Sequence, residues 1–449
     1  MSGLLTDLYE LTMAAGYVAA GKAHERATFE LFVRNLPPNR LFLVAAGLQQ
    51  AIDYLLNLRF TADDIGYLRG LPQFSRAPEA FFTALGDFRF SGDVFAVPEG
   101  TPVFAGEPIL TVRAPLLEAQ IPETYLLATI SFQTMIASKA ARVVEAAGGR
   151  GVVEFGTRRA HSPEAGTLAA RAAYIGGCLG TSNTEAGRRF GIPVYGTAAH
   201  SWVLSFPSEL ESFQQLQKLL GPSAIYLIDT YDTLEGARKA ASLGRPLWGV
   251  RLDSGDLNEL ARQVRKILDD AGLDDAKIMA TGDLNEYRIL ELTAAGAPID
   301  ALGVGTELAT SADKPNLGAV YKLVELETGG EKHYTAKLSE DKQTYPGSKQ
   351  VFRYRDRDLI ACSWECPTCA TGPGGEAEAL LRPVLIRGAL VDDLPDVHRA
   401  RQRAAAARKR LPAACRSLYD EHKPYRVEYS GELLALNEQT RKRMQESAP

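Results

Sequence analysis

Five short runs rich in apolar and β-branched residues follow one another through the middle of the chain, and helical patterns separate them. The runs cover residues 152–155, 224–228, 247–252, 277–280 and 301–304. Strands that alternate with helices of this length form βαβ units, in which the strands are parallel. The middle of the chain therefore predicts an α/β unit built on a parallel sheet. Periodicity alone leaves open whether that sheet closes into a barrel.

Polar and glycine residues stand at the end of every one of these runs. The segments are Gly156-Thr157-Arg158-Arg159, Asp229-Thr230, Asp253-Ser254-Gly255-Asp256, Thr281-Gly282-Asp283 and Gly303-Val304-Gly305-Thr306. Barrels and open α/β sheets place their active sites at the carboxyl ends of parallel strands. We therefore expect the functional site to lie where these five segments meet.

The chain is too long for one ordinary core, and its rhythm changes near residue 120 and again after residue 323. Residues 1–119 predict an α+β domain, with a helix that Thr6 and Asp7 can cap and a strand over 27–33. Residues 120–323 open with a long helical stretch and contain the α/β unit. Residues 324–449 are irregular and are expected to return to the first domain.

Composition excludes several classes of protein. A net charge of -5 gives no electrostatic footprint for nucleic acid, and the basic segment 398–410 has no aromatic residues to stack on bases, so we expect a solvated helix there. No apolar run approaches the length that spans a bilayer, and the first residues do not resemble a signal peptide. The odd total of five cysteines argues against a disulfide framework. We expect a cytoplasmic protein without a membrane partner.

Two of the strand ends carry residues suited to phosphorylated sugars. The loop Gly303 to Thr306 offers closely approachable backbone amides and a hydroxyl, which suit a phosphate monoester, although a plain βα turn has the same composition. Arg251 and Asp253 are two residues apart and point to the same side of their strand. They can bind a pyrophosphate and the ribose hydroxyls or Mg²⁺, or they can form an ion pair with each other.

Two further sites suit an aromatic acid and a reactive imidazole. Phe155 is followed by Arg158 and Arg159, and an aromatic face beside a guanidinium suits a small planar acid. Arginines at the start of a solvated helix would give the same sequence pattern, so this alternative stays open. His200, in the segment Gly196 to Ser201, is a candidate acid, base or nucleophile, or a structural histidine.

Cys362, Cys366 and Cys369 are spaced like half of a zinc knuckle. Structural zinc normally takes four ligands, and only the distant Cys415 and His422 offer a fourth. We expect thiols in a loop here rather than metal ligands, and a non-enzymatic zinc-binding module is the alternative.

Several segments together resemble the nicotinate phosphoribosyltransferase family, and the resemblance runs over most of the chain. The segments, which occur in the family's order, are Thr6 to Thr12, Glu154 to Ala160, Gly196 to Ser201, Gly249 to Asp256, Gly303 to Asn316 and Pro346 to Val351. The resemblance implies an irregular α/β barrel joined to a mixed α+β domain built from both chain ends. It also implies a homodimer with shared active sites.

The same resemblance implies an activity. The family forms nicotinate mononucleotide from nicotinate and phosphoribosyl pyrophosphate, in NAD biosynthesis, while it hydrolyses ATP with Mg²⁺ as cofactor. Its members carry a phosphohistidine at the position of His200, and Asp229 is our candidate for the neighbour that orients this imidazole. No ligand set for a resident metal is implied.

The resemblance also assigns the binding residues. Tyr9 of one subunit and Phe155 of the other are expected to sandwich the nicotinate ring, and Arg158 to meet its carboxylate. Arg251, Asp253, Asp283 and the loop Gly303 to Thr306, with Gly305, are expected to hold the phosphoribosyl group. Asp253 is also a candidate catalytic residue, and Thr197 and Gly282 are further candidate substrate-binding residues. Asn183 stands where nicotinamide-using relatives carry an aspartate, which favours an anionic substrate over the neutral ring of a nicotinamide phosphoribosyltransferase.

Overall fold

The computed structural model of the chain describes residues 2–337, 344–366, 377–394, 396–419 and 425–446. It divides into two compact units, of which unit 1 comprises Met1–Thr134, Asn316–Pro395 and Ala406–Pro449, and unit 2 comprises Met135–Pro315 and Asp396–Ala405. The sequence analysis placed its boundaries at 119/120 and 323/324. The predicted boundary at 119/120 lies just before a long helix, α6 (Glu123–Ala146). The division between the units falls within that helix instead, at 134/135.

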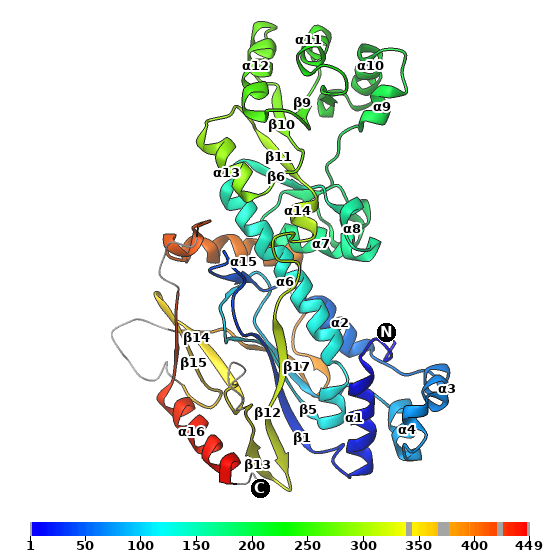
Figure 1. Cartoon of the computed structure of the whole chain (residues 1–449), viewed down its shortest axis with the longest axis vertical. Helices are drawn as coiled ribbons and strands as arrows, with labels where there is room; N and C mark the ends of the chain where they lie inside the picture. The colour runs from blue at the N-terminus through cyan, green and yellow to red at the C-terminus, as the bar shows by residue number, and fades with distance from the viewer. Residues whose placement is uncertain (1, 338–343, 367–376, 395, 420–424, 447–449) are drawn as a thin grey trace. The chain divides into compact units, whose positions relative to one another are not determined.

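Unit 1 is built on an antiparallel sheet of seven strands among the described residues, in the order β13-β12-β1-β5-β3-β17-β18. One of its inner strands is β1 (Arg26–Val33), which is buried at every residue except Arg26, including the polar residues Thr28 and Glu30. β1 pairs antiparallel with β5 (Pro108–Pro115) on one side and with β12 (Ala319–Thr328) on the other. The sheet thus combines strands that precede unit 2 in the sequence with strands that follow it (Figure 1).

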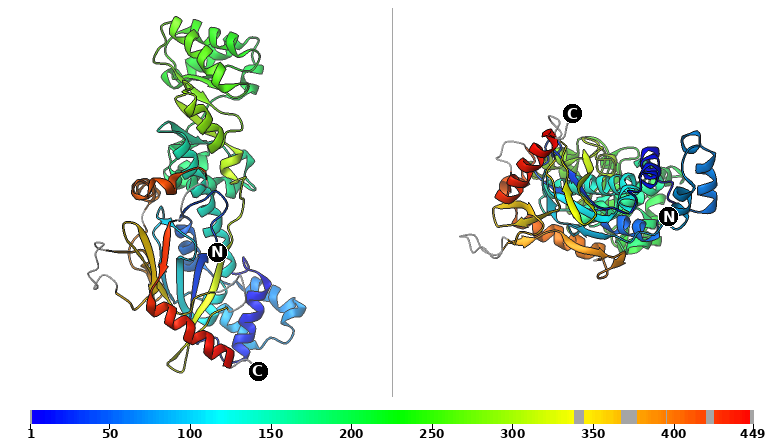
Figure 2. Two further views of the ribbon diagram at one scale, coloured as in Figure 1. Left: turned by 60° about the vertical axis from the view of Figure 1, so that its left-hand side comes forward. Right: turned by 90° about the horizontal axis from the view of Figure 1, so that it is seen from below.

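Smaller sheets and helices complete unit 1, and α16 packs against β15 (Figure 2). The helices are α1 (Leu8–Ala19), α2 (Leu48–Asn57), α3 (Ala62–Gly70), α4 (Glu79–Gly86), α5 (Leu116–Gln120) and α16 (Gly431–Glu446). The other strands are β2 (Leu43–Val44), β3 (Asp93–Ala96), β4 (Pro102–Val103), β13 (Glu331–Tyr334), β14 (Lys349–Arg353), β15 (Arg357–Cys362), β16 (Glu378–Ala379), β17 (Arg382–Ile386), β18 (Ala389–Leu390) and β19 (Arg426–Tyr429).

Unit 2 contains a parallel sheet in the order β7-β6-β11-β10-β9-β8. Its strands are β6 (Gly151–Glu154), β7 (Gly180–Thr181), β8 (Ile225–Leu227), β9 (Gly249–Leu252), β10 (Lys277–Ala280) and β11 (Ala301–Val304). The predicted α/β class is confirmed, and all five predicted runs contain a strand. Within the described residues β7 and β8 form the two ends of the sheet and do not pair with each other, so closure into a barrel is not seen.

The short strand β7 was not predicted from the sequence. It is extended by a single bridge, between Thr181 of β7 and Val194. Two hydrogen bonds flank this bridge, from the Thr181 amide to the Pro193 carbonyl and from the Tyr195 amide to the Thr181 carbonyl. The ladder ends there, so these residues stay outside the named strands.

The helices of unit 2 connect these strands. They are α7 (Pro163–Gly176), α8 (Thr184–Phe190), α9 (His200–Leu204), α10 (Glu209–Leu220), α11 (Thr233–Leu243), α12 (Leu257–Asp270), α13 (Glu286–Ala294) and α14 (Thr306–Ala309), and a short 3-10 turn, η2, covers Thr157–Arg159. Figure 1 shows α11 and α12 beside the sheet strands β9 and β10. α11 follows β8 and α12 follows β9, as expected for right-handed βαβ units.

The first part of helix α15 (Val397–Arg410) also belongs to unit 2. Nδ1 of His398 lies 2.8 Å from the Tyr174 hydroxyl, and Arg401 donates from Nε to the Cys178 carbonyl at 3.0 Å. Ala400 and Ala404 are buried. The helix expected at 398–410 is therefore present, but it is fastened to the end of α7 and is not fully solvated.

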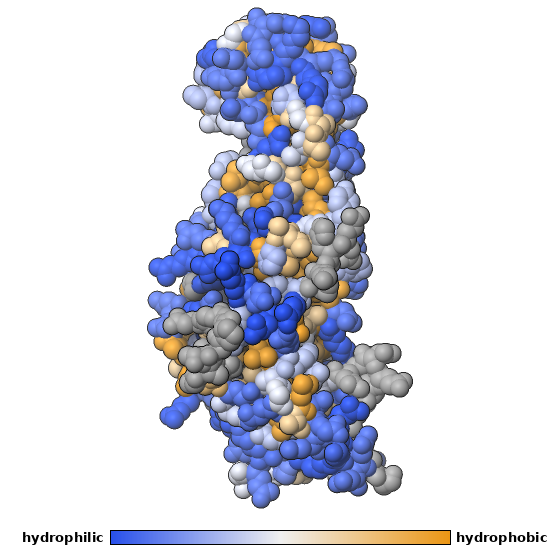
Figure 3. All heavy atoms as spheres, turned by 90° about the vertical axis from the view of Figure 1, so that its left-hand side faces the viewer, coloured by the Kyte–Doolittle hydropathy of each residue, from blue (hydrophilic) through white to orange (hydrophobic). Residues whose placement is uncertain are grey.

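No helix in the described part of the chain is both long and apolar enough to cross a membrane. The face in Figure 3 is largely hydrophilic, with hydrophobic residues in small groups.

Candidate active site

A cavity of ≈ 560 Å³ lies at the carboxyl ends of the parallel strands of unit 2, and we call it the strand-end cavity. Parallel strands bring their carboxyl ends to one edge, so residues far apart in sequence meet there. Ten of the predicted site residues line it: Phe155, Arg158, Thr197, Arg251, Asp253, Gly282, Asp283, Gly303, Gly305 and Thr306. Of the remaining predicted residues, Asn183, His200 and Asp229 belong to unit 2 and Tyr9 belongs to unit 1.

The loop after β11 forms one wall of the strand-end cavity. A Cβ atom on Gly303 would lie 2.6 Å from both the Phe155 ring and the Thr281 side chain, so only glycine fits there. At Gly305 the nearest atom to such a Cβ is the Phe155 carbonyl oxygen at 3.4 Å, an ordinary contact. The backbone at Gly305 is therefore accessible from the cavity, as a phosphate-binding loop requires.

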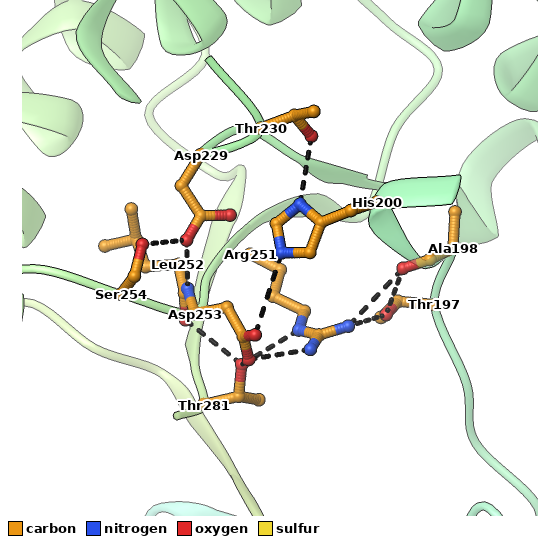
Figure 4. Close-up of polar contacts among 10 residues, drawn as sticks. All are labelled: Thr197, Ala198, His200, Asp229, Thr230, Arg251, Leu252, Asp253, Ser254 and Thr281. Atoms are coloured by element: carbon orange, nitrogen blue, oxygen red, sulfur yellow. Dashed lines mark hydrogen bonds and ion pairs between the residues drawn. The ribbon is translucent and has the colours of Figure 1, made fainter. Parts of the chain in front are cut away.

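Arg251 connects two of the strand-end segments with the segment that carries His200 (Figure 4). Its guanidinium donates from Nη2 to Asp253 Oδ1 at 2.7 Å, from Nε to Thr281 Oγ1 at 2.8 Å and from Nη1 to Thr197 Oγ1 at 2.7 Å. The sequence left open an Arg–Asp ion pair or a ligand site, and the structure has the ion pair within the wall of the cavity. Thr197 lies three residues before His200, so Arg251 also anchors the segment that carries the histidine.

Asp253 remains anionic at the edge of this network. Burial alone raises the pKa of its carboxyl group, but hydrogen bonds from Thr281 and Arg251, with the nearby positive charge, hold that pKa below the ordinary value. A carboxylate with a lowered pKa can interact with ribose hydroxyls or a metal-bound phosphate at neutral pH.

His200 is the first residue of α9, and its side chain is 42% exposed. Nδ1 lies 3.1 Å from the Thr230 hydroxyl oxygen, and Nε2 lies 3.8 Å from Asp253 Oδ2 (Figure 4). The predicted neighbour, Asp229, turns the other way, and its Oδ2 accepts hydrogen bonds from the Asp253 amide at 3.0 Å and the Ser254 hydroxyl at 2.6 Å. The prediction of Asp229 as the partner was wrong, because Thr230 is the residue whose hydroxyl meets His200 Nδ1.

The aromatic and cationic residues after β6 lie at another wall of the cavity. Phe155 is partly buried and packs against Val153, Met279 and Ala301, whereas Arg158 and Arg159 are exposed in η2. Beneath them the carboxylate of Glu154 accepts hydrogen bonds from the Gly156 amide and from the Thr181 hydroxyl. The aromatic face is thus held firmly, and the guanidinium groups can reach an anionic ligand.

Asn183 is almost fully buried and caps helix α8. Its side-chain oxygen accepts a hydrogen bond from the Ala186 amide at 2.8 Å, and its exposed fraction is 6%. The residues on either side of it, Ser182 and Thr184, line the strand-end cavity, although Asn183 itself does not. An aspartate at this position would cap the helix equally well, so capping does not explain why the residue is uncharged.

Tyr9, in unit 1, is 45% exposed. The adjacent Glu10 is fully buried, and burial raises the pKa of its carboxyl group to about 7. Its Oε1 accepts hydrogen bonds from the backbone and the hydroxyl of Thr124 at 2.9 and 2.7 Å. Tyr9 therefore stands at the edge of a buried carboxyl group and leaves much of its ring accessible.

The cysteines do not form a metal centre in the described part of the chain. Cys362 is buried in β15, and burial, with the charges of Glu365 and Glu432, raises the pKa of its thiol to about 12. No group of three or more potential metal ligands occurs among the described residues, and Cys369 and His422 lie outside them.

Sequence reasoning missed several lining residues. Tyr195 and Glu307 both face the cavity. Glu307 directly follows the predicted phosphate loop, and this position in the sequence could have indicated that it lines the cavity. Thr230, the partner of His200, was passed over because a charged neighbour was sought.

The chain matches known proteins along most of its length. Residues 4–131 match the nicotinate phosphoribosyltransferase (NAPRTase) N-terminal domain, and residues 151–353 match the nicotinate phosphoribosyltransferase (NAPRTase) family. A nicotinate phosphoribosyltransferase of Mycobacterium tuberculosis is 43% identical over 444 residues, which cover 97% of this chain and 93% of the relative. One from Bacillus subtilis is 45% identical over 359 residues, 78% of this chain and 72% of the relative.

A solved structure agrees with these matches. The crystal structure of human nicotinic acid phosphoribosyltransferase superposes with a TM-score of 0.84 at 30% identity and covers 97% of this chain and 99% of that one. The two family matches lie in the same regions as the segments that line the strand-end cavity and the segment that carries Tyr9. The chain belongs to the nicotinate phosphoribosyltransferase family.

Proposed function

We propose that this protein transfers the phosphoribosyl group of phosphoribosyl pyrophosphate to nicotinate, forming nicotinate mononucleotide and pyrophosphate in NAD biosynthesis. The observation that carries the proposal is the strand-end cavity, which combines an aromatic face and exposed arginines on one wall with an accessible glycine loop on another. These are the groups needed for an aromatic acid and a sugar phosphate, respectively.

The nicotinate ring is assigned to Phe155 and its carboxylate to Arg158. A guanidinium group can bind a carboxylate through two parallel hydrogen bonds, which selects an acid over an amide. Tyr9 from a second copy of the chain completes the ring site in this proposal, so a homodimer is part of it. The exposed ring of Tyr9 is consistent with that role.

The phosphoribosyl group is assigned to the loops that follow β9, β10 and β11. Gly303, Gly305 and Thr306 receive the 5-phosphate, and Arg251, Asp253 and Asp283 receive the ribose and the pyrophosphate. The pyridine nitrogen attacks the anomeric carbon, and the bond from that carbon to the pyrophosphate oxygen breaks. No base is needed because the nitrogen carries its own lone pair, so positioning of the two reactants supplies most of the catalysis.

In this proposal Mg²⁺ binds together with phosphoribosyl pyrophosphate. Mg²⁺ in proteins keeps several waters and is commonly held by one or two carboxylates together with substrate phosphates. Asp253 and Asp283 both line the cavity, and Asp253 Oδ1 is already engaged by Arg251 and Thr281. This donor set fits an ion that arrives on pyrophosphate, where it would neutralise charge on the leaving group.

ATP coupling is assigned to His200. If Nδ1 donates its proton to the Thr230 hydroxyl, Nε2 carries the free lone pair. Nε2 then attacks the γ-phosphorus of ATP, the bond to ADP breaks, and a phosphohistidine forms. Its hydrolysis accompanies nicotinate transfer.

Two measurements test this function. Turnover of nicotinate and of nicotinamide, each with and without ATP, should show a preference for nicotinate of about ten- to hundredfold, because an ionic hydrogen bond contributes roughly 1.5 to 3 kcal/mol. Equal specificity constants for the two rings would favour a nicotinamide phosphoribosyltransferase. Incubation with γ-labelled ATP should leave acid-labile, base-stable label on the wild type and none on His200→Ala. Label that persists in the variant would place the phosphoryl group elsewhere.

A further inference from the structure

A fully buried lysine lies behind the strand-end cavity. Lys139, on the unit 2 half of α6, has a side chain that is 1% exposed. Its Nζ lies 2.6 Å from Glu286 Oε2, 2.9 Å from Asp313 Oδ1 and 3.7 Å from Glu307 Oε2. One ammonium group thus joins three carboxylates from separate parts of unit 2.

These carboxylates follow the two loops that line the proposed phosphate side of the cavity. Glu286 begins α13, three residues after Asp283, and Glu307 lies in α14, two residues after Gly305. Asp313 lies beyond the end of the same short helix. Strands β10 and β11, which precede the two loops, are neighbours in the sheet. Lys139 therefore holds together the segments that leave two adjacent strands.

The network is firmly anchored on one side. Glu286 Oε1 also accepts a hydrogen bond from Arg142 Nε at 3.0 Å. Burial alone raises the pKa of Glu286, yet the charge and hydrogen bond of Lys139, with those of Arg142, hold that pKa below the ordinary value. Glu286 is thus a fixed anion between two cations. Burying a charged group is unfavourable unless its partners are well placed, so Lys139 constrains the positions of all three carboxylates.

The positive charge of Lys139 also affects the electrostatics of the cavity. Glu307 lines the cavity next to the loop that we assign to the 5-phosphate. An unpaired carboxylate at that point would repel a phosphate dianion. The ammonium group of Lys139 offsets this charge and draws the Glu307 carboxylate toward the protein interior.

We propose that Lys139 is a positioning residue for the sugar-phosphate subsite: through Glu286, Glu307 and Asp313 it holds the loops at 281–284 and 303–306 at the spacing that a 5-phosphate requires. This inference rests on the proposed function, which assigns the phosphate to the Gly303 to Thr306 loop. The inference predicts that Lys139 affects sugar-phosphate binding although it is not one of the residues that line the cavity.

The test compares Lys139→Met with Lys239→Met in the full-length protein. Lys239 pairs with the buried Glu209 at 2.9 Å in the same unit, so its replacement also leaves a buried glutamate without its lysine, but neither residue lines the cavity. Calorimetry with ribose 5-phosphate should show a dissociation constant raised about tenfold to a hundredfold in Lys139→Met. Lys239→Met should change it less than about twofold. The KM for nicotinate should stay within about twofold in both variants, and Lys139→Arg should restore part of the affinity.

Each outcome decides the matter. Equal ribose 5-phosphate affinity in Lys139→Met and wild type, or an equal loss in the two methionine variants, would overturn the positioning role. If Lys139→Met does not fold, Glu307→Gln and Asp313→Asn replace it, since both side chains are about one-third exposed. Unchanged affinity in both would then overturn it. A wild type that neither binds ribose 5-phosphate nor turns over phosphoribosyl pyrophosphate would instead refute the proposed function.

Discussion

Replacing Asn183 by aspartate adds one negative charge beside the strand-end cavity and changes little else. The new carboxylate can accept the hydrogen bond from the Ala186 amide that the Asn183 oxygen accepts at 2.8 Å. Asparagine and aspartate cap helices about equally, so the helix cap is kept, and the cost to folding is that of placing a charge at a largely buried position. Thermal unfolding of the same samples separates a change in substrate use from a loss of folded protein.

The size of the electrostatic effect follows from the position of Asn183. Its two sequence neighbours line the cavity, so a charge there lies on the order of 8 Å from the carboxylate of a bound nicotinate. At an effective dielectric constant near 20, two like charges at that separation repel by about 2 kcal/mol. The specificity constant for nicotinate should fall roughly thirtyfold. The neutral nicotinamide feels no such repulsion.

The assay is steady-state turnover of both rings at saturating phosphoribosyl pyrophosphate and ATP, with thermal unfolding of the same samples. The nicotinate-to-nicotinamide ratio of specificity constants should drop about thirtyfold in Asn183→Asp. Asn183→Ser keeps a capping side chain without the charge and is the matched control, with a ratio near that of the wild type. A folded Asn183→Asp protein with an unchanged ratio would refute the argument that charge at this position selects the substrate.

Three further predictions test other parts of the structure. Gly303→Ala should lower the unfolding free energy by about 1–3 kcal/mol in denaturant titration, because its Cβ would lie 2.6 Å from two side chains, whereas Gly305→Ala should change it much less; equal effects would contradict this geometry. Thr230→Val removes the partner of His200 Nδ1 and should slow phosphohistidine labelling about two- to tenfold, while transfer without ATP stays unchanged. The pKa of Glu10 is raised from 4.5 to about 7, so the folded state binds more protons than the unfolded state between these values. The melting temperature should therefore fall as pH rises from 4.5 through about 7, and Glu10→Gln should flatten that dependence.

The sequence predicted best what depends on local pattern. The five strand runs and the polar residues at their ends were recognised because a buried parallel strand is apolar along its length and its carboxyl end is not. Arg251, Asp253, Thr281 and Thr197 lie together because they meet at the carboxyl-end edge of the parallel sheet. The family resemblance added the residue assignments that composition could not provide.

Features that depend on the direction of a side chain, or on partners distant in the sequence, were predicted less well. Asp229 and Thr230 are adjacent, and which of them meets His200 depends on the local backbone after β8, where Thr230 lies in a bend that the sequence does not predict. Lys139 reads as one polar residue of a helical stretch, and its three carboxylates lie more than 140 residues away in the sequence. The bridge at Val194 depends on a two-residue strand, which is too short to leave a periodic pattern.

The participation of residues 396–405 in unit 2 has a consequence for how the protein is made. Unit 2 begins at residue 135, but Arg401 and His398, which bind the end of α7, are synthesised about 80 residues after Pro315, where the main part of that unit ends. During translation the nascent chain must therefore carry unit 2 without its last helical segment while the second half of unit 1 emerges. A ribosome stalled between residues 315 and 396 would expose the carbonyl groups of Gly177 and Cys178, and the same ends would be left open in a fragment cut at residue 315. The two units are thus interleaved in order of synthesis, and neither can be completed before the ribosome has passed residue 405.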